Sequence, residues 1–190
     1  MYRRSPSSIL DRIGVFCSSS EVLSESVIQA TQELGAWIGS HKKMLVYGGV
    51  NKGLMEVIAC AVKQHGGRVM GILPQAFACP ERQSQYVDIE VPVSHLCDRK
   101  ATLTRESDVF IVLPGGIGTL DEMFCVLAAR QVGEHHKPVM LFNPDGCWNP
   151  LIQALQVLED QHYIRSGYTR SIVCIDRIDE AIHWLEQQDQ

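Results

Sequence analysis

The stretch Val109-Phe-Ile-Val-Leu-Pro-Gly-Gly-Ile-Gly-Thr-Leu-Asp-Glu122 decides the fold class of this chain. The continuous apolar run at 109–113 is typical of a strand buried on both faces of a parallel sheet. Proline and glycine then end the strand, and we expect a helix from about Thr119 to Gln131. A buried strand that runs directly into a helix is the repeating unit of α/β proteins.

The same alternation of short β-rich runs and longer helical segments extends in both directions from this stretch. We expect further strands at 13–18, 44–47, 69–73, 139–142 and 172–175, and a short one at 86–91. We expect further helices at 24–38, 54–65, 99–107 with Asp98 as N-cap, near 150–160 and from Asp179. The pattern predicts one doubly wound α/β domain over residues 1–190, with a mainly parallel sheet and helices on both faces. Residues 1–11 and 187–190 are expected to be flexible termini.

The composition excludes several classes of protein. Of the 190 residues, 45% are hydrophobic and 21% are charged, so the chain can form a packed core. Its net charge of −5 does not suit a protein that wraps nucleic acid or lies on an anionic membrane. No apolar run approaches the roughly 20 residues that cross a bilayer. We therefore expect neither a nucleic-acid partner nor a membrane partner.

The cysteines indicate a reducing environment. The seven are Cys17, Cys60, Cys79, Cys97, Cys125, Cys147 and Cys174. They are spread evenly, include no CxxC pair, and several lie in apolar runs, as expected for thiols used as small hydrophobes in a cytoplasmic protein. The spacing argues against zinc, and the adjacent His135 and His136 cannot readily face one ion. We therefore expect no bound metal.

Two expected strands end in glycine loops, Gly48–Gly53 and Pro114–Thr119. Ligands of parallel α/β sheets bind beyond the carboxyl ends of the strands, and a following helix N-terminus favours anions such as phosphate. The first loop is not a P-loop, because Leu54 and Met55 stand where lysine and serine or threonine are required. In the second loop, Asp121 stands where a dinucleotide fingerprint has a small residue, which makes NAD(P) binding unfavourable.

Charged residues beside the second loop allow two interpretations each. Asp121 and Glu122 are well placed to reach a sugar attached to a bound phosphate, but Thr119-x-x-Glu122 also matches a capping box. Arg99 and Lys100 fall in the first turn of their expected helix, where the dipole disfavours cations. They are either a solvated surface pair or, if that helix starts at the same sheet edge, cations that face the loop.

These motifs together resemble a known family. Arg99-Lys100 followed by Pro114-Gly-Gly-Ile-Gly-Thr-Leu-Asp-Glu122 resembles the RK…PGGxGTxxE signature of the Lonely Guy proteins, the cytokinin riboside 5′-monophosphate phosphoribohydrolases. The resemblance extends to Tyr47-Gly-Gly49, Gly53-Leu-Met55 and Lys137-Pro-Val139, and it covers roughly residues 12–185. Departures at Val50, Leu96-Cys97 and Ile117 fall where they could reshape a base pocket.

The resemblance implies a Rossmann-like enzyme, dimeric or larger, that hydrolyses the N-glycosidic bond of a nucleoside 5′-monophosphate without any cofactor. Products would be the free base and ribose 5-phosphate, and a purine nucleotide such as AMP is expected as substrate, with cytokinin ribotides left open. The implied catalytic pair is Glu122 and Arg99. The implied substrate contacts are Gly48, Gly49, Glu81, Lys100, Gly115, Gly116, Ile117, Gly118, Thr119 and Asp121.

Two other functions remain open from the sequence. A non-catalytic nucleotide-binding or carrier module would keep the glycine loop but release no base. A pyridoxal-phosphate lysine decarboxylase would require a lysine Schiff base, for which Lys100 is the lysine beside the expected site.

Overall fold

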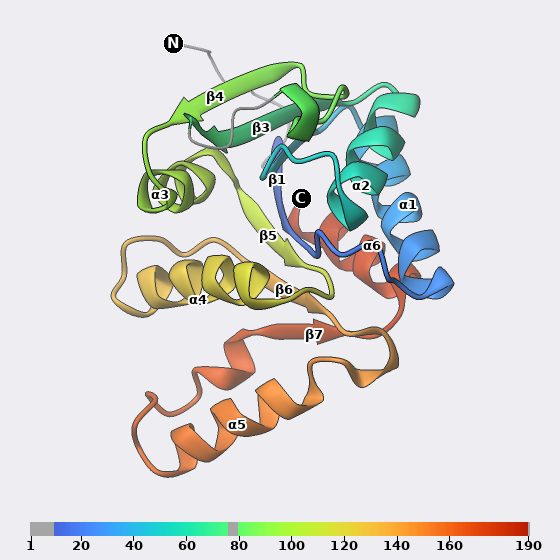
Figure 1. Cartoon of the computed structure of the whole chain (residues 1–190). Coiled ribbons are helices and arrows are strands. Elements are labelled where there is room, and N and C mark those ends of the chain that lie inside the picture. The colour runs from blue at the N-terminus through green and yellow to red at the C-terminus, as the bar shows by residue number, and fades with distance from the viewer. Residues whose placement is uncertain (1–9, 76–79, 190) are drawn as a thin grey trace.

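The computed structural model describes residues 10–75 and 80–189, which form one α/β domain around a seven-stranded sheet (Figure 1). The strand order is β4-β3-β2-β1-β5-β6-β7, and every pairing is parallel. The strands are β1 (Arg12–Phe16), β2 (Met44–Tyr47), β3 (Arg68–Pro74), β4 (Ile89–Val93), β5 (Val109–Val112), β6 (Val139–Phe142) and β7 (Val173–Ile175). The predicted doubly wound fold is confirmed.

In the described residues, six α-helices cover the two faces of the sheet, five of them between consecutive strands and the last after β7 (Figure 1). They are α1 (Glu25–Ser40), α2 (Gly53–Gln64), α3 (Leu96–Glu106), α4 (Ile117–Gln131), α5 (Asn149–Asp160) and α6 (Ile178–Gln188). Short 3-10 turns lie at Pro80–Arg82, Pro144–Gly146 and Thr169–Ser171. Helices α1, α2 and α6 lie on one face, and α3, α4 and α5 lie on the other (Figure 1).

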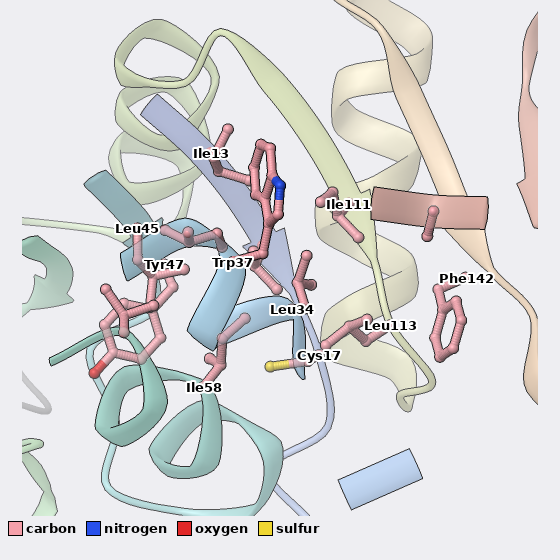
Figure 2. Close-up of a cluster of buried hydrophobic side chains, with 14 of the residues drawn as sticks. Ile13, Cys17, Leu34, Trp37, Leu45, Tyr47, Ile58, Ile111, Leu113 and Phe142 are labelled. Carbon is pink, nitrogen blue, oxygen red and sulfur yellow. The ribbon is translucent and has the colours of Figure 1, made fainter. Parts of the chain in front are cut away.

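Alternate residues of the central strands supply two separate hydrophobic cores, because successive side chains of a strand point to opposite faces. Ile111 of β5 belongs to the core under α1, α2 and α6, whereas its neighbours Phe110 and Val112 pack under α3 and α4. Figure 2 shows the first core, in which Leu34 and Trp37 of α1 gather with side chains of the central strands. The five-residue apolar run is therefore buried on both sides, as its sequence predicts.

The bounds expected for one strand and for the helix after it are wrong. The strand expected at 86–91 is Ile89–Val93, and its pairing with β3 begins at Met70↔Ile89. Helix α3 begins at Leu96 rather than 99, so Asp98 is not its N-cap. His95 is the N-cap, and the Asp98 carboxylate instead accepts a hydrogen bond from the His95 backbone N–H at 3.1 Å. An acid in the first turn can bond backward in this way, so its presence does not mark the first residue.

Residues near both ends of the chain meet beside β2. Leu10 is buried, and its N–H donates to the Asp189 carboxylate at 3.0 Å. The ammonium of Lys43, which is itself buried, also pairs with Asp189. Of the termini expected to be flexible, 1–11 and 187–190, residues 1–9 and 190 lie outside the described residues. No helix in the described part of the chain is long and apolar enough to span a bilayer.

Candidate active site

A cleft of about 710 Å³ opens at the carboxyl ends of β1 and β5. Between these two strands the order of the sheet reverses, with β2 to β4 on one side and β6 and β7 on the other. This reversal is the point at which doubly wound proteins bind ligands. The lining residues are Cys17, Ser18, Ser19, Ser20, Val50, Lys52, Met55, Arg82, Arg99, Gly116, Ile117, Gly118, Thr119 and Glu122.

Backbone hydrogen bonds through Ser18 hold three loops of the cleft together. The Ser18 N–H donates to Pro114 O at 3.1 Å, which ties the loop after β1 to the loop after β5. Its carbonyl accepts from the Leu54 N–H at 3.0 Å and so occupies one free donor at the start of α2. Gly53 makes this approach possible with a φ of +53°, because a Cβ there would lie 2.4 Å from Ser20 O.

The start of α4 is open to the cleft. Gly116 is the N-cap, Gly116, Ile117 and Gly118 are exposed, and a Cβ at Gly116 or Gly118 would meet no described atom within 4 Å. The first backbone bond inside the helix is Leu120 N–H to Gly116 O, so the N–H groups of the preceding turn have no intrahelical acceptor. These donors and the positive end of the helix dipole form a site for an anion.

The structure excludes the capping-box interpretation of Thr119 and Glu122. Helix α4 starts at Ile117, so Thr119 is its third residue and Glu122 lies one turn further in. The Thr119 side chain packs against Gly115, where a Cβ would lie 2.1 Å from its Oγ1. The helix starts early because Gly116 adopts the extended cap conformation directly after the loop. Glu122 is therefore free to point inward rather than back to the cap.

Glu122 and Arg99 form an ion pair at the floor of the cleft. The Arg99 Nη1 lies 3.1 Å from Glu122 Oε1, and the two side chains are 16% and 6% exposed. Arg99 also donates from Nε to Ile72 O at 3.1 Å. Its guanidinium lies against Gly48, because a Cβ at that position would be 2.0 Å from Nη2. Gly48 thus provides space for Arg99 and is not among the residues that line the cleft.

Burial raises the pKa of the Glu122 carboxyl above its ordinary value, and the Arg99 charge only partly opposes this. Arg99 is the fourth residue of α3, since the helix begins at Leu96, so it does not lie in the first turn as the sequence predicted. The repulsion between the Arg99 charge and the positive end of the helix dipole is therefore small. A carboxylate held beside a guanidinium in this way can stabilise a developing cation or accept a proton.

Several residues implied by the family resemblance lie outside the cleft lining. Lys100 pairs with Asp121 at 2.8 Å between α3 and α4, and this hydrogen bond raises the pKa of Lys100. Glu81 is exposed, and its carbonyl accepts from Asn51 Nδ2 at 2.9 Å. Gly49 forms a turn with a φ of +75° against Leu73. Substrate contact by these residues stays a prediction.

The sequence interpretation missed one whole wall of the cleft. Residues Ser18–Ser20, at the carboxyl end of β1, line it beside Lys52, Met55 and Arg82. Their position in the sequence could have predicted this. The serines directly follow the first strand, beside the point where the strand order of a doubly wound sheet reverses. Cys17 also lines the cleft, but burial raises the pKa of its thiol far above the ordinary value, so it is no nucleophile.

Metal-binding chemistry finds no support in the described residues, which hold no group of three or more histidine, cysteine, aspartate or glutamate side chains placed to share an ion. The six described cysteines are all free thiols, and Cys79 lies outside the described residues.

Comparisons with known proteins agree with this architecture. Residues 55–185 match the family model described as "Possible lysine decarboxylase". Two cytokinin riboside 5′-monophosphate phosphoribohydrolases of Arabidopsis thaliana are 37% and 36% identical to this chain. Their matches cover 94% and 92% of this chain and 82% and 77% of the relatives.

Solved structures with a similar fold include a molybdenum cofactor binding protein from Rippkaea orientalis, 24% identical with a TM-score of 0.71 over 94% of this chain and 96% of that one. A Moco carrier protein from Chlamydomonas reinhardtii is 25% identical, also with a TM-score of 0.71, over 94% and 97% of the two chains. The family resemblance seen in the motifs is thereby confirmed: the chain belongs to the family of the cytokinin riboside 5′-monophosphate phosphoribohydrolases.

Proposed function

We propose that this protein hydrolyses the N-glycosidic bond of a purine nucleoside 5′-monophosphate, giving the free base and ribose 5-phosphate. The observation that carries the proposal is the buried Glu122–Arg99 pair on the floor of a cleft that also holds the open start of α4. An anion site and a buried carboxylate in one cleft suit a substrate with a phosphate near its reacting carbon. The activity in the names of the Arabidopsis relatives supports the same reaction.

In this proposal the phosphate binds the N–H groups of Ile117, Gly118 and Thr119 and thereby holds the anomeric carbon near Glu122. The C1′–base bond breaks with its electron pair going to the base, and the ribosyl ring becomes positively charged. The Glu122 carboxylate stabilises this charge and accepts a proton from the attacking water, whose oxygen bonds to C1′. The departing base takes up a proton from solvent, and Glu122 returns its proton to solvent before the next turnover. Arg99 stays charged and fixes the orientation of Glu122.

The proposal is tested by incubating the purified protein with AMP, other nucleoside monophosphates and adenosine, followed by chromatography of the products. We expect adenine and ribose 5-phosphate in equal amounts from AMP. Adenosine should react far more slowly, because the phosphate contributes binding energy remote from the reacting bond. Release of no base from any monophosphate would overturn the proposal. Isopentenyladenosine monophosphate in the same panel measures any preference for cytokinin ribotides.

A non-catalytic carrier is the second candidate, and its support is the similarity of fold to the Moco carrier protein. Binding of a ligand without turnover in the same panel would favour it. A lysine Schiff base, in contrast, needs an amine that can lose its proton. The hydrogen bond that Lys100 donates to the Asp121 carboxylate raises the pKa of Lys100 and so keeps its ammonium protonated, and the pair lies outside the cleft lining.

We further propose a homodimer or larger homo-oligomer in the cytoplasm. The support is an apolar set of exposed side chains on and after α4, namely Ile117 at 82%, Phe124 at 41% and Val132 at 74% exposure. Light scattering after size-exclusion chromatography tests the oligomer, and a monomer at micromolar concentration would contradict it.

A further inference from the structure

Two cations in the cleft lining have no carboxylate partner among the described residues. Lys52, the N-cap of α2, and Arg82, at the end of the turn Pro80–Arg82, are both exposed cleft residues. Neither side chain makes an ion pair or hydrogen bond with any residue in the described ranges 10–75 and 80–189. Many other cations of the chain do have carboxylate partners: Arg12, Lys43, Lys63, Arg99, Lys100, Arg105 and Arg177.

The backbone fixes both cations on one wall of the cleft. The Asn51 N–H donates to the carbonyl of Arg82 at 3.0 Å, and Val50 forms an antiparallel bridge with Gln83. The loop that carries Lys52 is thus hydrogen-bonded to the turn that carries Arg82. Both cations therefore come from neighbouring backbone segments and line the same cleft, and their positive charge suits this wall to an anion.

The cleft holds enough positive charge to bind one phosphate monoester. Glu122 and Arg99 neutralise each other, and the start of α4 contributes only about half a positive charge. A phosphate monoester carries about −1.5 to −2 charges at pH 7. The two charges of Lys52 and Arg82 more than cover the roughly 1 to 1.5 charges that the α4 dipole leaves uncompensated.

We propose that Lys52 and Arg82 bind the 5′-phosphate of the substrate from the wall facing the start of α4 and set the preference for a nucleoside monophosphate over a nucleoside. This inference rests on the proposed function, because it concerns the same substrate. It assigns the two residues a role in specificity and none in the bond-breaking step. Because both side chains are exposed, their replacement leaves the core intact.

The experiment measures dissociation constants for AMP and adenosine by titration calorimetry, in wild type and in the Lys52→Ala, Arg82→Ala and double variants. Arg165→Ala is the control, because Arg165 is an exposed cation outside the cleft lining with no ion pair to a described residue. We expect each single variant to weaken AMP binding about fivefold and the double variant about twentyfold. Adenosine binding should stay unchanged, and Arg165→Ala should change neither.

Two further arms sharpen the result. Arg82→Lys keeps the charge and should restore most of the AMP affinity, and raising the salt concentration should weaken AMP binding less in the double variant than in wild type. Equal loss for AMP and adenosine, or no loss for AMP, would overturn the inference. The inference would also be overturned if the wild type bound ADP more tightly than AMP and the double variant lost this preference for ADP. The two cations would then bind a second phosphate. AMP binding is measured without turnover. A protein that shows these losses of AMP affinity but releases no adenine would therefore refute the proposed function and support the inference.

Discussion

Replacement of Glu122 by glutamine tests the central chemical claim most directly. The amide keeps the size of the side chain and an oxygen that can accept a hydrogen bond from Arg99, so only the negative charge is lost. The Glu122 side chain is 6% exposed, and burial raises its pKa. Keeping this carboxylate ionised in the native fold therefore costs free energy. We therefore expect Glu122→Gln to fold normally and to unfold at a temperature no lower than that of the wild type.

The expected loss of rate follows from the position of the charge. A carboxylate about 4 Å from a full positive charge contributes about 4 kcal/mol at an effective dielectric constant of 20. Since about 1.4 kcal/mol corresponds to a tenfold change in rate, this is a loss of roughly a thousandfold in kcat. Removal of a single preorganised group that stabilises transition-state charge in other enzymes costs about 10² to 10³.

The assay is single-turnover and steady-state release of adenine from AMP, with circular dichroism and thermal unfolding as checks of the fold. Glu134→Gln is the matched control, because Glu134 is an exposed acid just beyond α4 and outside the cleft lining. The control should retain the wild-type rate within about twofold. A well-folded Glu122→Gln protein with more than a tenth of the wild-type kcat would refute the reasoning, since the carboxylate would then have only a structural role.

Four further predictions rest on individual residues of the structure. Gly48→Ala should lower kcat/KM at least tenfold by displacing the guanidinium that lies on it, whereas Gly116→Ala, with open space around it, should leave thermal stability unchanged. The acid limb of the kcat/KM profile should have its midpoint above the ordinary glutamate value of about 4.3, because the pKa of Glu122 is raised; a midpoint at or below that value contradicts the assignment. For the same reason, the contribution of Glu122 to stability is lost as pH rises between the unfolded and the native pKa, and urea titrations should lack this slope in Glu122→Gln. Asp189→Asn should lower the free energy of unfolding by about 2 kcal/mol, because it removes the counter-charge of the buried Lys43; an unchanged urea midpoint would show that the pair contributes nothing.

The pattern of apolar runs was sufficient to predict the sheet and most helices. The strands at 44–47 and 139–142 coincide with β2 and β6, because buried parallel strands have continuous apolar sequences bounded by glycine or proline. The pattern failed at 86–91, where Tyr86 and Val87 alternate with polar residues but pack beside the first core without strand pairing. Alternation reports which side chains are buried, and it does not report which backbone groups are paired.

By itself, the sequence determined the parallel fold and the glycine loop at the start of α4, because both depend on local patterns of apolar residues and glycine. Only the tertiary structure decided what surrounds that loop. The pairing of Arg99 with Glu122 and the wall formed by Lys52 and Arg82 join segments that lie far apart in the chain. Such contacts depend on the order of strands in the sheet and on the residue at which each helix begins. A shift of two residues in the start of α4 turned Glu122 from a capping side chain into the buried acid of the cleft.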